Sequence, residues 1–179
     1  ITMIFLGLGV GQLFFGPMSD SFGRKPIIYI GFLIFILSSI LCIFATSLEV
    51  MIIGRILQGI GLSAARTISI SIIRDTYEGN YMAKVMSFVT AFFILVPVVA
   101  PAFGKVILES LGWQAIFYMQ MFFAIVIGIW FWKRQPETLH PEYKVPFTRH
   151  VFVDGLKELI KYKETLACTT ISGLITGAF

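Results

Sequence analysis

The fold is decided at the stretch Gly16-Pro17-Met18-Ser19-Asp20-Ser21-Phe22-Gly23-Arg24-Lys25-Pro26, which connects two long runs without a charged side chain. The first run covers residues 1–19 and the second covers residues 26–48. A helix needs about 20 apolar residues to cross a hydrocarbon core about 30 Å thick. The stretch therefore predicts a short turn between two membrane-spanning helices.

Further apolar runs extend this pattern along the chain. Residues 85–104 and 113–132 carry no charge, and residues 50–73 are interrupted only by Arg55 and Arg66. Charged residues make up 13% of the chain, against about a quarter in soluble domains, so a water-soluble fold is excluded. Because backbone polar groups in lipid must be satisfied internally, we expect an all-α, polytopic transmembrane helix bundle.

The basic residues set the expected orientation. Eleven Lys and Arg residues fall in one set of connections and only Lys105 falls in the other. Positive charge collects on the cytoplasmic side, so residue 1 is expected near the outer face of a multi-pass cell-membrane protein. The eleven are Arg24, Lys25, Arg74, Lys84, Lys133, Arg134, Lys144, Arg149, Lys157, Lys161 and Lys163.

The turn itself contains residues suited to a helix boundary. We expect Asp20 to act as the N-cap of the incoming helix and Gly23 to adopt a positive φ. Arg24 and Lys25 would anchor the cytoplasmic boundary. Such a capped turn could occur in any membrane protein, but it does not explain why all these residue types occur at this spacing.

That spacing resembles motif A of the major facilitator superfamily, G-x-L-a-D-r-x-G-r-k, between helices two and three. Five positions match and two depart from the pattern: Gly16, Asp20, Gly23, Arg24 and Lys25 match, while Met18 and Ser21 depart. In the family, the motif A Asp and Arg contact an acidic residue at the cytoplasmic end of helix four. Asp75 occupies that place, so the resemblance implies an Asp20–Arg24–Asp75 network, the latch, that holds the outward-open state.

A second stretch, residues 55–59, resembles motif B, R-x-x-Q-G, of proton-driven drug exporters. Arg55 inside a span costs about 2.5–3.5 kcal/mol, so it is expected to face a cavity or a partner. Gln58 lies one turn further on the same face. The resemblance implies a role for both in proton coupling. The alternative is an Arg55 side chain that extends to the membrane surface.

Arg66 has no counterpart in the family pattern. Eleven residues correspond to about three turns plus 20°, so Arg55 and Arg66 project from one stripe of the helix, about 16 Å apart. Two interpretations of Arg66 stay open: a cavity cation for anionic cargo, and a side chain that reaches the cytoplasmic surface.

Residues 96–104 resemble motif C, the helix-five element of antiporters, in the form found in Bcr/CflA drug exporters. Pro101 and Gly104 fit the motif, whereas Pro97 replaces its first Gly and Lys105 its last. The prolines are expected to kink the helix. Smaller likenesses are Gly112-Trp113-Gln114 at the start of helix six and Pro136-Glu137-Thr138-Leu139 at the start of the central loop.

The resemblance divides the chain into three parts. Residues 1–132 would be helices two to six of the amino-terminal bundle, residues 133–164 a cytoplasmic central loop, and residues 165–179 the start of helix seven. The loop contains a basic amphipathic stretch at residues 151–163, which would lie on the membrane or form a solvated linker helix. Both chain ends are expected to be truncations.

The function implied is secondary active transport, with proton-coupled efflux of drugs or other small molecules by alternating access. The implied partners are a small-molecule substrate, protons and lipid, without nucleic acid, and the full-length protein is expected to be a monomer. Neither an ATP-binding loop nor a His/Cys cluster is present, and no nucleophile–base pair is found. We therefore expect no cofactor, no metal and no enzymatic activity.

Two alternatives to an exporter stay open, a facilitator-superfamily importer of a metabolite and a non-transporting structural subunit. Motif B and the proline-rich helix five favour export, and a structural subunit would have little reason to keep Arg55 and Gln58 inside the bilayer. No Asp or Glu lies well inside a span. We therefore expect the proton-carrying carboxylate on a helix that precedes residue 1.

Overall fold

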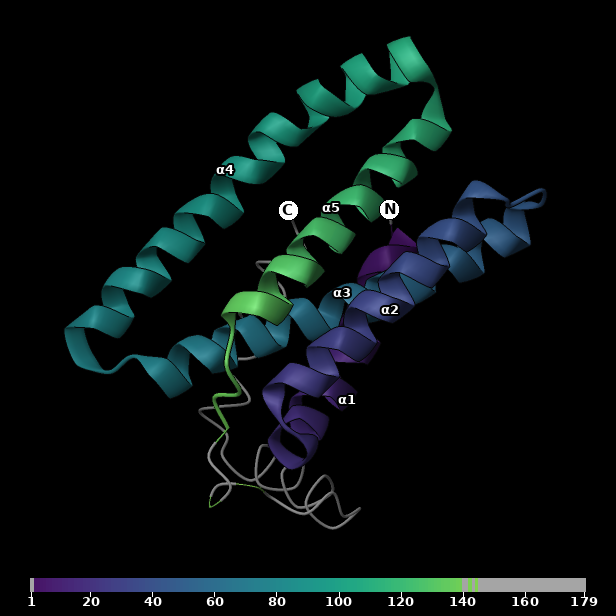
Figure 1. Cartoon of the computed structure of the whole chain (residues 1–179). Coiled ribbons are helices and arrows are strands. Elements are labelled where there is room, and N and C mark those ends of the chain that lie inside the picture. Colours follow the sequence, from purple (N-terminus) through teal and green to yellow (C-terminus); the bar gives the residue numbers. More distant parts are fainter. Residues whose placement is uncertain (1, 140–141, 143, 145–179) are drawn as a thin grey trace, which may run out of the picture. The chain divides into compact units, whose positions relative to one another are not determined.

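A computed structural model describes residues 2–139, 142 and 144. Within these residues the chain forms five α-helices and no strand: α1 (Thr2–Phe22), α2 (Arg24–Ile43), α3 (Leu48–Thr76), α4 (Gly79–Leu111) and α5 (Trp113–Arg134) (Figure 1). All five are long and apolar enough to cross a membrane. The predicted all-α fold and the multi-pass membrane location are confirmed. The expected amphipathic helix and the start of a further span at residues 165–179 lie outside the described residues.

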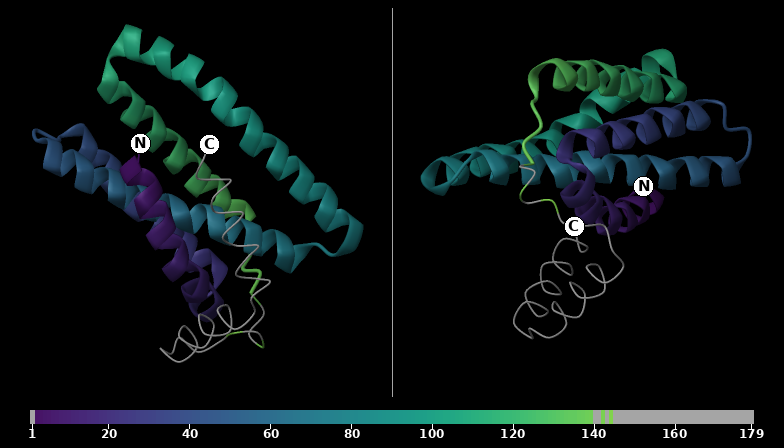
Figure 2. Two further views of the ribbon diagram at one scale, coloured as in Figure 1. Left: turned by 180° about the vertical axis from the view of Figure 1, so that it is seen from behind. Right: turned by 60° about the horizontal axis from the view of Figure 1, so that its bottom comes forward.

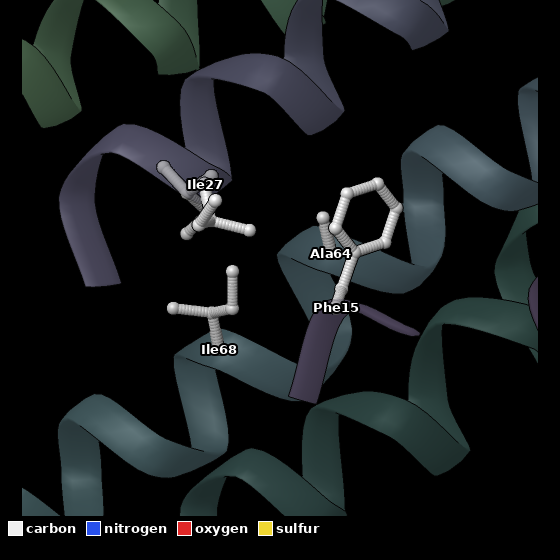
Figure 3. Packing of buried hydrophobic residues seen from close by; sticks show 5 residues of the cluster. Phe15, Ile27, Ala64 and Ile68 are labelled. Carbon is white, nitrogen blue, oxygen red and sulfur yellow. The ribbon is translucent and has the colours of Figure 1, made fainter. Parts of the chain in front are cut away.

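Helices α1 and α2 both pack on α3. The main buried cluster takes Phe15 from α1, Ile27 and Ile28 from α2, and Ala64 and Ile68 from α3 (Figure 3). In lipid, where tails are as apolar as these side chains, close packing rather than water exclusion stabilises such a contact. This three-helix packing places the end of α1, the start of α2 and α3 in direct contact.

Small residues permit the closest approach, between α1 and α3. A Cβ atom on Gly7 would collide with the carbonyl oxygen of Ile56, and a Cβ on Gly59 would collide with the carbonyl oxygen of Ile4. The two helix backbones therefore touch at these glycines. Small residues at helix interfaces in membranes commonly permit such close backbone contact.

Helices α4 and α5 are consecutive and run antiparallel, joined at Gly112, in all views (Figures 1 and 2). Gly112 has a φ of 84°, a conformation that favours glycine. Helix α4 contains Pro97 and Pro101 without ending at either, and none of its residues is buried in the described part of the chain. Its side chains are thus placed to meet lipid or further protein.

Candidate functional site

The turn between α1 and α2 is built differently from the sequence prediction at one point. The N-cap of α2 is Gly23, with a φ of 106°, so the predicted positive φ is confirmed. Asp20 is not the N-cap, because α1 continues to Phe22 and Asp20 lies in its last turn. From there its carboxylate reaches the Arg24 side chain four residues on.

Arg24 is the centre of an ionic network at this turn. Its Nη1 lies 2.5 Å from Asp20 Oδ1, and its Nε lies 3.0 Å from Asp75 Oδ2 at the end of α3. Nη1 also donates to the buried hydroxyl of Ser19 at 2.7 Å. The Arg24 side chain is 10% exposed. The structure thus brings together the three latch residues, while their gating role stays a prediction.

Two further motif A residues complete the turn. The carbonyl oxygen of Gly16 accepts a hydrogen bond from Ser19 Oγ at 2.8 Å, so Gly16 orients the hydroxyl that faces Arg24. Lys25 Nζ donates to the carbonyl oxygen of Trp132 at 3.2 Å, at the end of α5. Motif A therefore contacts α5 as well as α3.

Glu137 also belongs to this site, although sequence reasoning gave it no role. Its Oε1 accepts from the backbone N–H of Arg24 at 2.9 Å, and its Oε2 accepts from the backbone N–H of Lys25 at 3.0 Å. The sequence prediction assigned the cap to Asp20, whereas a helix whose N-cap is Gly23 has no local capping side chain and needs an acceptor from elsewhere. Nothing in the sequence identified a residue 113 positions away as the acceptor.

The motif B residues lie inside the bundle. Gln58 is 2% exposed, and its Nε2 donates to Ser39 Oγ on α2 at 2.8 Å and to Gln120 Oε1 on α5 at 3.5 Å. The Arg55 guanidinium lies over the ring of Phe117 on α5, 4.4 Å from its centroid. Such a cation–π contact partly replaces the water lost by the guanidinium.

Arg66 and the helix-five residues lie apart from motif B. The exposed Arg66 places its guanidinium 5.6 Å from the ring centroid of Phe93 on α4, so Arg55 and Arg66 contact different helices. Gly104 lines a cavity of about 450 Å³ between α4 and α5. Neither proline of the motif is among the residues that line it.

Gln120 is a second residue that sequence reasoning missed. It lines the cavity between α4 and α5 and also a cavity of about 240 Å³ between α2, α3 and α5. The other lining residues of both cavities are apolar. A glutamine inside an apolar run was a sequence signal for such a position.

Comparisons with known proteins agree with this architecture. The family model described as Major Facilitator Superfamily matches residues 1–179. Multidrug resistance protein MdtL of Salmonella typhimurium is 35% identical over 123 residues, which cover 69% of this chain and 31% of the relative. The Bicyclomycin resistance protein homolog of Haemophilus influenzae is 33% identical over 166 residues, covering 93% of this chain and 42% of the relative. The chain thus spans roughly a third to two fifths of these relatives' length.

Proposed function

The chain belongs to the Major Facilitator Superfamily, and from this premise we propose that it forms most of the amino-terminal bundle of a proton-coupled exporter. The cargo would be drugs or other small molecules, exchanged for protons across a bacterial inner membrane. The printed names of the relatives, multidrug and bicyclomycin resistance proteins, favour export over import of a metabolite. In this proposal the full-length protein is a monomer and has no enzymatic activity.

The observation that carries the proposal is the setting of Arg55. Its guanidinium lies between α3 and the buried Phe117 of α5, and it forms no ion pair with any carboxylate among the described residues. A guanidinium remains charged at every accessible pH, so Arg55 cannot itself carry the transported proton. It would instead favour the ionised form of a carboxylate brought within about 4–6 Å.

That property supplies a coupling mechanism. A carboxylate beside Arg55 would release its proton, and the same carboxylate moved away would bind one again. If alternating access moves the two groups together and apart, proton affinity changes with the side to which the site is open. Gln58, held by Ser39 and Gln120, would fix the face of α3 from which Arg55 projects.

The cavities beside Gln120 suggest where an apolar cargo would contact this bundle. Their walls are aliphatic and aromatic, while the Gln120 amide is the polar group that both share. Ligand sites of this kind combine apolar walls with a few polar groups that orient the ligand. Gln120→Leu should therefore weaken transport of a cargo with hydrogen-bonding groups more than transport of a purely apolar cation.

The proposal is tested with the full-length protein in proteoliposomes that contain a trapped pH dye. Lipophilic cations, including ethidium, and neutral drugs are added at an imposed pH gradient. Substrate-dependent proton movement opposite to the flux of at least one compound is expected. Proton and compound movement in the same direction would support an importer, and no flux of any compound above protein-free vesicles would contradict transport.

A further inference from the structure

The start of α2 depends on a group from outside the helix. The first four N–H groups of a helix have no acceptor within it, and Gly23 at the N-cap has no side chain to supply one. Gly23 N–H donates to the Ser19 carbonyl at 3.1 Å, and Pro26 has no N–H. The remaining two donors, on Arg24 and Lys25, both bind the Glu137 carboxylate. Glu137 thus completes the cap.

The absence of a side chain at residue 23 leaves room for this carboxylate. A Cβ atom at Gly23 would lie 2.9 Å from Glu137 Oε2, so the Glu137 side chain would have to shift away from the N–H groups that it binds. Two features therefore favour glycine at position 23: the φ of 106° and the close approach of the Glu137 carboxylate. By contrast, Gly112 has a φ of 84° and nothing within 4 Å of a Cβ. It offers a matched control in which only the backbone conformation matters.

The segment that carries Glu137, residues 135–139, is fastened to the latch at several points, and we name it the strap. Thr138 Oγ1 donates to Asp75 Oδ2 at 3.5 Å, the same oxygen that binds Arg24. Leu139 is buried, and its N–H donates to Glu137 Oε1 at 3.2 Å. The strap therefore touches both the start of α2 and the acidic partner at the end of α3.

The charges at this site are consistent with a third carboxylate beside the latch. Asp20 and Asp75 already share the Arg24 guanidinium, so Glu137 needs other positive charge. It receives it from the N-terminal end of α2, which carries about half a positive charge. Hydrogen bonds to an ionised acceptor are about twice as strong as neutral ones. The backbone of Arg24 is thereby fixed while its side chain holds the two aspartates.

We infer that Glu137 is a positioning residue for the latch: it holds the first turn of α2 so that Arg24 stays between Asp20 and Asp75. The strap begins where α5 ends, and it links any displacement of α5 to the ionic network. The gating consequence rests on the proposed transport function, whereas the positioning of Arg24 does not. No residue of the strap belongs to the network predicted from the sequence.

The positioning is tested by amide hydrogen exchange on the full-length protein in lipid nanodiscs. In Glu137→Ala, the Arg24 and Lys25 amides should exchange about tenfold faster, as expected for hydrogen bonds to a charged group. Glu137→Gln keeps one acceptor oxygen and should give a smaller increase. The end of α3 around Asp75 should also exchange faster, since Arg24 is no longer held against it. The control is Glu142→Gln, an acid in the same connection with no partner among the described residues.

Each outcome of this experiment decides the inference. Unchanged exchange at Arg24 and Lys25 would show that Glu137 does not cap α2. Faster exchange at Arg24 and Lys25 with no change around Asp75 would show that Glu137 only caps α2. That result would contradict the inference that Glu137 positions Arg24. If the wild type transports a compound and the Glu137 variants transport it at the same rate, the inferred link between Glu137 and gating by the latch is wrong. A wild type without transport would contradict the proposed function, while the exchange data would still decide the positioning.

A second experiment uses the two positive-φ glycines. Gly23→Ala should lower the thermal stability of the full-length protein more than Gly112→Ala, because only Gly23→Ala also collides with Glu137. In a Glu137→Ala background, that excess should disappear. An excess that persists without the Glu137 side chain would contradict the close approach on which the strap depends.

Discussion

Gln58 on α3 donates a 2.8 Å hydrogen bond to the hydroxyl of Ser39 on α2, and both side chains are buried. The Ser39 hydroxyl in turn donates to the carbonyl oxygen of Phe35, one turn earlier. Gln58 therefore occupies a fixed position between helices, one turn from Arg55. A motif residue proposed to act in coupling is held by a hydrogen bond rather than left mobile in a cavity.

Gln58→Leu should preserve folding but slow proton-coupled transport. Interhelical hydrogen bonds in membranes contribute about 0.6 kcal/mol on average, so the loss of thermal stability should be small. The transport rate should fall by more than this loss of stability explains, because Gln58 would no longer fix the face of α3 from which Arg55 projects. Ser38→Ala is the control, since the Ser38 hydroxyl donates within its own helix to the Phe35 carbonyl and has no other hydrogen bond in the described part of the chain. Equal transport rates in both variants would remove Gln58 from the mechanism.

Asp20→Asn should destabilise the outward-open state. The substitution keeps the volume of the side chain but removes the charge that faces Arg24, and breaking a partly buried ion pair from one side is costly. The conformational equilibrium can be followed by labelling of single cysteines on the two membrane faces. Arg74→Ala, an exposed residue next to Asp75, should leave that equilibrium unchanged. The latch hypothesis fails if Asp20→Asn and Arg24→Ala both behave like Arg74→Ala.

Arg55→Lys should impair coupling more than folding. Lysine keeps the charge but lacks the planar guanidinium, so both the stacking on Phe117 and a bidentate carboxylate contact weaken. Efflux of ethidium from proteoliposomes at an imposed pH gradient measures coupling, and a thermal melt measures folding. Arg66→Lys serves as the comparison on the same helix. Wild-type transport rates in both Arg55→Lys and Arg55→Ala would remove Arg55 from the coupling mechanism. The alternative, an Arg55 side chain that extends to the membrane surface, would then stand.

The topology is predicted to place Glu109 outside the cell and Lys144 inside. Single cysteines at these two positions, in a full-length background without Cys42 and Cys168, are probed with an impermeant thiol reagent on intact cells. Position 109 should be labelled at once, and position 144 only after permeabilisation. The reverse pattern would overturn the orientation assigned from the basic residues.

The sequence alone determined the five spans, since charge-free length and the absence of hydrogen-bonding solvent in lipid leave helices as the only solution. The resemblance to motif A implied the contacts of Arg24 with Asp20 and Asp75, and both are present. The sequence prediction misplaced the N-cap, because whether α1 ends before or after Asp20 depends on contacts beyond the local sequence. Only the tertiary structure decided that the cap of α2 comes from Glu137 and that Gln58 bonds to Ser39 and Gln120. Those pairs join residues far apart in the chain, and helix packing, which no local pattern encodes, sets which of them meet.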